Sequence, residues 1–496
     1  MASRLKSYRP WLGAIWIYWW TRLHQLDSLP IFLDEAAHIW WARLAWEWQP
    51  FHAASDGRLL NVLWAAVFWP FNGSVWVTRA ATVLLTTVGF AALLTFARRF
   101  LPPRAATVTA VTYIIVPFTL FFERMQLPDT YATACSIILL WSSAELARSP
   151  NRRINIIIVG LALVASLLSK ITSLVFVPVP ALAALMMGKS DHWRSHASAT
   201  LRVYLLAGAM LVPVLVVLHT IAHSDLGLDL LARKTSNSPA EMWSQAQITG
   251  PMVWNYFQVL FTPWLWWLSL LAIAISLPRI SRVSLYICAT AMLGMVILIA
   301  KSNPNFLEAR FALPYVAFLI LLTANGTSTL WKYVAKQGTA IRITAIILGL
   351  LSLFPSGKSM WNTFQTPEEL ELPDRDTWEY IRGWPSGYGF REIATQFNER
   401  DIPTQLLTFD LGGQQRIAAY LPHGSQITPV WVPPEKFHAL QPEVGTRSLL
   451  VLDHPKDDAD LAKLRLELRP IRTYPRPLEE SWLTVYELEI PIRQKD

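Results

Sequence analysis

The sequence predicts a polytopic α-helical membrane protein that ends in a small α/β domain. Three observations predict this fold class. Hydrophobic residues make up 53% of the 496 residues and charged residues only 16%, whereas a soluble chain usually carries about 25% charged residues. The apolar residues lie in long runs, and short basic clusters separate those runs. The last part of the chain has no run long enough to cross a bilayer.

The composition also argues against two other classes of protein. A net charge of +8 would suit nucleic-acid binding, but the basic residues fall between apolar runs, as in the cytoplasmic loops of membrane proteins. Cys135 and Cys288 both lie inside apolar runs. We therefore expect two small buried side chains there, with no disulfide framework and no zinc site.

A helix that crosses a bilayer needs about 20 mostly apolar residues. The first apolar run follows a basic start, as in a signal peptide, but it lacks a small-residue cleavage site, so we expect a retained span. About eleven spans are predicted in total, near residues 10–29, 75–97, 105–123, 128–146, 154–170, 171–188, 203–222, 256–277, 283–300, 306–325 and 341–358.

Basic residues mark one side of the membrane. They precede the first predicted span and follow the second, fourth, sixth, eighth and tenth, which places every cluster on the same side. By the positive-inside rule this side is cytoplasmic, and so is the N-terminus. Eleven crossings then place the C-terminal part outside the cytoplasm. The expected location is a cell membrane, either a plasma or an inner membrane, with the chain crossing it many times.

The sequence divides into a transmembrane part, residues 1–358, and an extracytoplasmic α/β domain, residues 359–496. In the second part "QLLTFD", "SLLVLD" and "WLTVYELEI" are typical of buried strands, and "FREIATQFNER" and "DADLAKLRLEL" of amphipathic helices. The glycine-rich stretch 382–400 is interpreted as a structural turn that docks this domain. The first outer loop of the transmembrane part, about residues 30–74, holds the stretch "IFLDEAAHIWW".

Ionisable residues collect at the outward ends of the predicted spans. Such groups are costly near the bilayer, about 2.5–3.5 kcal/mol each at a helix centre and less towards the interface. Any one of them alone fits a side chain that reaches for the headgroups. Their convergence from four separate junctions favours a functional site, made from Asp34, Glu35, His38, Glu123, Arg124, Asp129, Lys170, Lys301, Glu308 and Arg310.

Carboxylates and fixed cations together suit one chemistry well. Lysine and arginine can hold a lipid phosphate at headgroup depth, and a carboxylate can remove the proton of an acceptor hydroxyl. A departing phosphate also gains negative charge that these cations stabilise. Asp34 and Glu35 are therefore candidate catalytic carboxylates for transfer of a lipid-linked sugar.

The sequence resembles the GT-C superfamily of membrane glycosyltransferases. The resemblance rests on the Asp34–Glu35 pair, "ERMQLPD", "LSKITSLVFVP" and "EARFALPY", in that order, over roughly residues 10–325. Within the superfamily the chain is most similar to enzymes related to protein O-mannosyltransferases and the aminoarabinose transferase of lipid A. It departs from them at "DGRLLNVLW", where relatives often carry a Pro-Pro-Leu-like element, so Asp56 and Arg58 are candidates for a role specific to this chain.

This resemblance implies inverting transfer from a polyprenyl-phosphate sugar to an extracytoplasmic acceptor, which is a protein, a lipid or an envelope glycan. It implies that Asp34 is the general base, with Glu35 and Asp129 as further catalytic carboxylates. Glu123, Arg124 and Asp129 would line the cavity, and Lys170 and Arg310 would bind the donor phosphate. Lys301 is a further candidate for phosphate binding, with an interfacial anchor as the alternative.

Other hypotheses remain open at this point. A divalent-metal site made by Asp34, Glu35 and His38 is the alternative at the first loop, and otherwise no metal or cofactor is predicted. A transporter or flippase for a lipid-linked or anionic solute is the alternative function, although that class favours charges near mid-span and paired half-repeats. A non-catalytic member of a glycan assembly complex is a further hypothesis.

Overall fold

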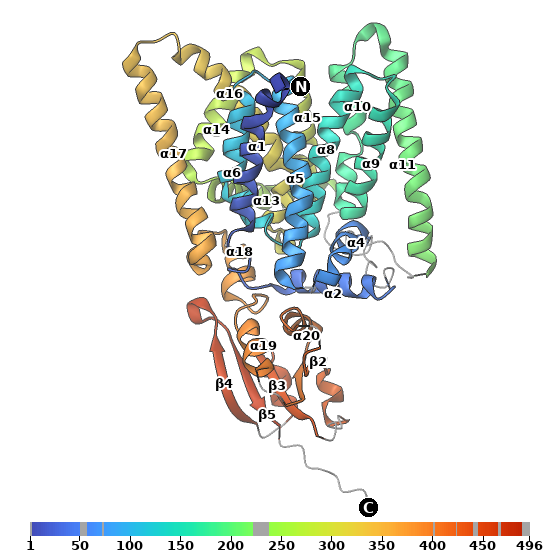
Figure 1. Ribbon diagram of the computed structural model, residues 1–496, viewed down its shortest axis with the longest axis vertical. Helices are drawn as coiled ribbons and strands as arrows, with labels where there is room; N and C mark the ends of the chain where they lie inside the picture. Colours follow the sequence, from blue (N-terminus) through green and yellow to red (C-terminus); the bar gives the residue numbers. More distant parts are fainter. Residues whose placement is uncertain are drawn as a thin grey trace, which may run out of the picture.

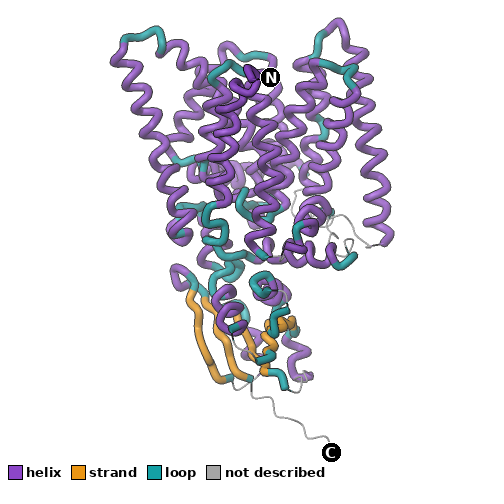
Figure 2. The backbone as a smooth tube through the Cα atoms, viewed as in Figure 1, coloured by secondary structure: helices purple, strands orange, loops and turns teal. Residues whose placement is uncertain are grey.

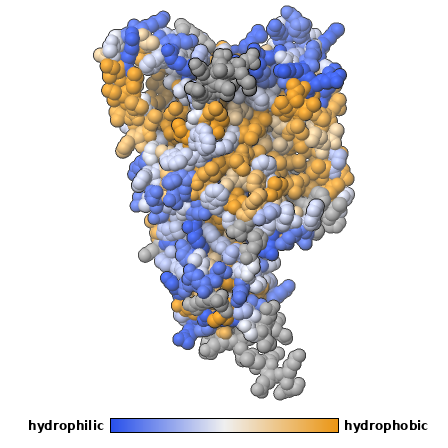
Figure 3. All heavy atoms as spheres, in the orientation of Figure 1, coloured by the Kyte–Doolittle hydropathy of each residue, from blue (hydrophilic) through white to orange (hydrophobic). Residues whose placement is uncertain are grey.

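The computed structural model describes residues 2–49, 57–71, 74–221, 238–399, 402–422, 424–439, 445–464 and 468–488. Helices form one large bundle, and a mixed sheet with its own helices stands at one end of it (Figure 1). The N-terminus lies at the opposite end of the bundle. Figure 2 shows that the strands are confined to the C-terminal part. A hydrophobic belt covers the visible face of the bundle (Figure 3), as expected for a protein embedded in lipid.

The bundle begins with α1 (Ala2–Leu23), followed by α2 (Leu33–Trp46), which lies across its sheet-facing end (Figure 1). The following helices are α4 (Leu59–Val67), α5 (Val75–Phe100), α6 (Ala105–Ile115), α7 (Pro117–Phe122), α8 (Pro128–Arg148), α9 (Arg153–Ser169), α10 (Val179–Met187) and α11 (Trp193–Ile221). The bundle ends with α13 (Pro239–Leu260), α14 (Pro263–Ser276), α15 (Arg282–Lys301), α16 (Leu313–Val334) and α17 (Thr339–Gln365). Short 3₁₀ turns η2 (Ile171–Phe176) and η6 (Ala309–Ala312) precede α10 and α16.

Helices occupy each of the eleven predicted ranges, but not all are long uninterrupted spans. Among the described residues, five helices are long and apolar enough to cross a membrane, or up to six if a bent pair counts as one span. The others are shorter or broken. The fold class is therefore mostly helical with several apolar helices, and the number eleven stays a prediction.

Proline explains two of the breaks. The predicted span 105–123 is divided at Pro117, and the predicted span 256–277 is divided before Pro263, where α13 and α14 meet at a bend of 110°. Proline lacks an N–H and disfavours the helical conformation of the residue before it. Thr262, the residue before Pro263, lies outside the helical region, with φ +66° and ψ 143°. The prediction of one continuous span over 256–277 was wrong for this reason.

The C-terminal part contains a five-stranded sheet in the order β2-β1-β3-β5-β4. Its strands are β1 (Thr404–Thr408), β2 (Ile427–Trp431), β3 (Arg447–His454), β4 (Arg469–Pro475) and β5 (Trp482–Glu487). The first three strands are parallel, and β5 runs antiparallel to β3 and β4. The predicted strands correspond to β1, β3 and β5, and the predicted helices to α19 (Phe390–Asn398) and α21 (Asp458–Leu464). Strands β2 and β4 and helix α20 (Leu411–Ala418) were not predicted.

The sheet part is fixed to the residues that precede α2. The backbone N–H of Leu33 donates to the carbonyl of Pro385, and the N–H of Ile31 donates to the hydroxyl of Tyr420 at 2.6 Å. A Cβ at Gly387 would lie only 1.7 Å from the carbonyl oxygen of Ile31, so only glycine allows this approach. The interpretation of residues 382–400 as a docking turn is confirmed.

Candidate active site

The first turn of α2 directs its two acids in different directions. Phe32 is extended and α2 begins at Leu33, which leaves Asp34 and Glu35 in the first turn, where the helix dipole favours negative charge. Consecutive residues on a helix point about 100° apart. Asp34 lines a cavity, whereas Glu35 is fully buried in the protein interior.

Glu35 belongs to a buried network of hydrogen bonds. Its two carboxylate oxygens accept from Arg79 at 2.8 and 2.7 Å, and it also accepts the backbone N–H of Gln126 at 2.9 Å. Arg79 in turn donates to the carbonyls of Leu26 and Leu29. This network closes the loop before α2. Glu35 is not among the described residues that line the cavity, which argues against its predicted role as a catalytic carboxylate.

The cavity has a volume of about 490 Å³. Asp34 and His38 of α2, the helix that crosses the sheet-facing end of the bundle (Figure 1), line part of it. One part of its wall is apolar, built by Leu174 and Phe176 of η2, Ile297 and Leu298 of α15, and Phe311. The other part is ionisable, built by Asp34, His38, Arg58, Asp129, Lys170, Lys301 and Arg310. The structure thus brings together six of the predicted site residues: Asp34, His38, Asp129, Lys170, Lys301 and Arg310.

Ion pairs connect the predicted carboxylates and cations. Lys170 follows the last residue of α9, and its ammonium lies 2.5 Å from Asp129 Oδ1 and 4.1 Å from the ring centre of Phe311. The guanidinium of Arg310 donates from Nη2 to Asp34 Oδ2 at 2.6 Å. Its Nε lies 2.5 Å from Glu308 Oε2 and 3.9 Å from Asp129 Oδ2.

Asp34 is the accessible carboxylate of this group. Its side chain is 42% exposed, whereas those of Asp129 and Glu308 are 5% and 8% exposed. Burial by itself would raise the pKa of Asp34, but the positive charge of Arg310 outweighs this effect and holds the pKa well below its usual value. The carboxylate is therefore ionised at neutral pH.

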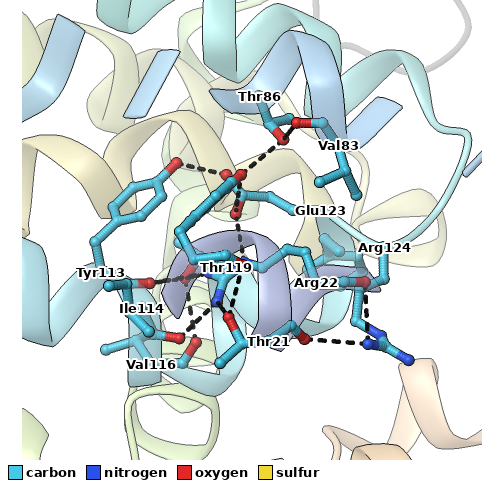
Figure 4. A network of polar contacts seen from close by, with 12 residues as sticks. Thr21, Arg22, Val83, Thr86, Tyr113, Ile114, Val116, Thr119, Glu123 and Arg124 are labelled. Carbon is cyan, nitrogen blue, oxygen red and sulfur yellow. Dashed lines mark hydrogen bonds and ion pairs between the residues drawn. The ribbon is translucent and has the colours of Figure 1, made fainter. Parts of the chain in front are cut away.

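Glu123 and Arg124 lie in a separate buried network (Figure 4). Glu123 Oε2 accepts from Arg22 Nε at 3.1 Å, and its carboxylate also accepts from the hydroxyls of Tyr113 at 2.6 Å and Tyr18 at 3.1 Å. Arg124 donates to backbone carbonyls in the last turn of α1 and just after it, at Thr21, Arg22, His24 and Gln25. Neither residue is among the described residues that line the cavity, which corrects the prediction that they line it.

Replacing Glu123 with glutamine is expected to lower stability and not donor binding. The change leaves the buried charge of Arg22 without its partner, and breaking a buried ion pair in this way typically costs about 3–5 kcal/mol. We expect a lower melting temperature in detergent, with binding of a lipid phosphate unchanged at low temperature. Glu371→Gln is the matched control, because the Glu371 side chain is 76% exposed and surface pairs contribute little. An unchanged melting temperature would contradict the structural assignment of Glu123.

Asp34, Glu35 and His38 are not placed together as a metal site in the described part of the chain. His38 Nε2 faces Nη1 of Arg58 at 3.0 Å, and Glu35 faces Arg79 on another side of α2. Among the described residues no group of three or more His, Cys, Asp or Glu is placed to hold a metal ion. Arg58 lines the cavity, which fits the expectation of a role specific to this chain, while Asp56 lies outside the described residues.

The sequence analysis did not identify two arginines as partners of the predicted acids. Arg22 and Arg79 lie within helices α1 and α5, and each is the buried partner of a predicted acid. A charged residue inside an apolar run was the available signal, because such a residue is usually paired. Pairing Arg79 with Glu35 would have separated the role of Glu35 from that of Asp34 on sequence grounds alone.

Comparisons with known proteins find chains of similar fold. The family model described as dolichyl-phosphate-mannose-protein mannosyltransferase matches residues 60–217, and no curated protein matches the chain. ArnT from Cupriavidus metallidurans bound to undecaprenyl phosphate has a similar structure, with TM-score 0.64, 15% identity and 96% of each chain covered. Its apo state gives TM-score 0.61 and 13% identity over 97% of this chain and 98% of that one.

A more distant likeness is to the archaeal oligosaccharyltransferase AglB from Archaeoglobus fulgidus in complex with an inhibitory peptide and a dolichol-phosphate. It has TM-score 0.51 and 11% identity, over 97% of this chain and 74% of that one. At such identities the likeness concerns the fold. Together with the family match it confirms the resemblance to GT-C membrane glycosyltransferases.

Proposed function

We propose that the protein transfers a sugar from a polyprenyl-phosphate carrier to an acceptor hydroxyl, with inversion at the anomeric carbon. The observation that carries this proposal is that Asp34, Lys170 and Arg310, far apart in the sequence, line one cavity that also has an apolar wall. The family match and the undecaprenyl phosphate held by ArnT support a lipid-phosphate donor.

The two parts of the wall suit the two parts of such a donor. Lys170 and Arg310 offer an ammonium and a guanidinium to the phosphate, which are the strongest partners for that anion. The apolar wall made by η2, α15 and Phe311 suits an isoprenoid chain. The sugar would then lie between the cations and Asp34.

Asp34 takes the role of general base. As the acceptor oxygen attacks the anomeric carbon, its proton passes to the Asp34 carboxylate, and the bond from the anomeric carbon to the phosphate oxygen breaks with its electron pair staying on the phosphate. Lys170 and Arg310 stabilise the negative charge that grows there. Inversion requires that the base and the leaving phosphate lie on opposite faces of the sugar.

We further propose that the cavity opens on the extracytoplasmic side of a cell membrane, the side of the sheet part. Support comes from α5, which begins at Val75 and carries Arg98 and Arg99 in its last turn. Basic residues favour the cytoplasmic side, so the start of α5 and the neighbouring α2 would face outward. The acceptor is then an extracytoplasmic hydroxyl compound.

Binding and transfer together test the proposal. The full chain in nanodiscs is expected to bind undecaprenyl phosphate saturably and to bind undecaprenol, which lacks the phosphate, far more weakly. Polyprenyl-phosphate sugars labelled in both the sugar and the lipid should then lose the sugar label when acceptor membranes are added. Movement of both labels together across the bilayer would instead support the transporter alternative. Equal binding of the two lipids would contradict a phosphate site.

A further inference from the structure

Arg310 presents two neighbouring donors of its guanidinium to different surroundings. Its Nε lies beside Glu308, which is buried and is not among the described residues that line the cavity. Its Nη2 donates to Asp34, whose side chain is 42% exposed and lines the cavity. A guanidinium is rigid and planar, so a carboxylate beside Nε also orients Nη2. Nη2, which faces Asp34, is therefore a donor that a ligand in the cavity can reach.

The same arrangement recurs at the other cation. Lys170 is paired with Asp129 at 2.5 Å, and both residues line the cavity. Each cation assigned to the donor phosphate therefore already has a carboxylate partner inside the protein. A phosphate that approaches Arg310 Nη2 or the Lys170 ammonium competes with these carboxylates for the same N–H donors.

We propose that the donor phosphate and the Asp34 carboxylate are alternative partners of Arg310 Nη2, and that Glu308, which forms an ion pair at the neighbouring Nε, is the positioning residue that orients the guanidinium. This inference rests on the proposed function. Before the donor binds, Asp34 is neutralised by Arg310. When the phosphate takes its place, Asp34 is released to receive the proton of the acceptor hydroxyl, so that the base becomes active only when a donor is present.

The electrostatics of Asp34 agree with this exchange. Burial would raise its pKa, and Arg310 is the largest of the charges that lower it instead. A carboxylate held at a low pKa is a weak proton acceptor. Once the phosphate neutralises Arg310, this lowering is reduced and the pKa of Asp34 rises towards the range of a useful base. The exchange thus couples donor binding to the basicity of the carboxylate.

Equilibrium binding of undecaprenyl phosphate to the full chain in nanodiscs tests the exchange. Asp34→Asn is expected to bind this lipid roughly tenfold more tightly than the unaltered chain, because the competing anion is gone. Glu308→Gln is expected to bind it roughly tenfold more weakly, because Arg310 loses the carboxylate beside Nε that orients it, and Glu308→Asp should restore part of the affinity. Glu371→Gln is the control and should not change binding.

A control lipid and a second Asp34 variant distinguish a failure of this exchange from a failure of the proposed function. Undecaprenol should bind equally to all variants, since it has no phosphate to compete. Asp34→Ser repeats the test with a smaller side chain, should Asp34→Asn fold poorly. Unchanged or weaker binding in both Asp34 variants, together with lost transfer, would overturn the exchange and leave the proposed function standing. Full transfer by Asp34→Asn would overturn the proposed function itself.

Discussion

Replacing Asp34 with asparagine should reduce sugar transfer about 10²–10⁴-fold, the usual contribution of a general base. Asparagine has nearly the same shape but does not accept a proton at neutral pH. The side chain is 42% exposed and lies at the cavity wall, so the variant should fold and melt like the original chain. The measurement is the initial rate of transfer from a labelled polyprenyl-phosphate sugar in nanodiscs, at saturating donor.

Glu35 provides the matched control for this prediction. Glu35→Gln changes the neighbouring acid by the same single atom, but Glu35 is buried against Arg79 and does not line the cavity. It should lower the melting temperature, and the folded fraction should keep its transfer rate. If Asp34→Asn retained full activity while Glu35→Gln lost it without unfolding, the two assignments would have to be exchanged.

Replacing Lys170 with methionine should weaken donor binding about 10–100-fold, the range expected for one charge-assisted hydrogen bond. Methionine keeps the apolar stem beside Phe311 but removes the ammonium, which leaves the carboxylate of Asp129 facing the incoming phosphate. The effect should appear mainly in KM for the donor. Titration with undecaprenyl phosphate measures the same loss directly.

Two further variants sharpen the test of Lys170. Lys170→Arg keeps the positive charge and should recover part of the affinity. Lys358→Met makes the same chemical change at a side chain that is 62% exposed, and it should have no effect. Unchanged donor affinity in both Lys170→Met and Arg310→Ala would remove the phosphate site from this cavity.

Much of the fold could be predicted because apolar runs and alternation are strong local signals. The predicted strands β1 and β3 are buried, and β5 lies inside the sheet between β3 and β4. The two missed strands, β2 and β4, are the sheet edges, and both contain proline, at Pro429 and at Pro470 and Pro475. Proline is tolerated at an edge but weakens a strand pattern in the sequence. The missed breaks before Pro117 and Pro263 have the same origin.

Less of the candidate site than of the fold could be predicted. Asp34, Lys170 and Arg310 stand at the ends of apolar runs, and the cost of placing charge there indicated a shared purpose. The direction of each side chain was not readable from that signal. Glu35 points into the protein because it pairs with Arg79, which lies 44 positions away in the sequence. Glu123 points inward because it pairs with Arg22, which lies 101 positions away. Such pairings depend on how helices pack, which spacing along one segment does not reveal.

Every described residue that lines the cavity precedes residue 316. The residues just before Asp34, however, are held by contacts from the C-terminal part of the chain. The backbone N–H groups of Ile31 and Leu33 donate hydrogen bonds to the Tyr420 hydroxyl and the Pro385 carbonyl. Gly387 lies against the carbonyl oxygen of Ile31. A protein truncated before its sheet would keep every described lining residue but lose these contacts with the residues next to Asp34. The C-terminal part therefore helps to hold Asp34 at the cavity wall, although it contributes no described residue to that wall.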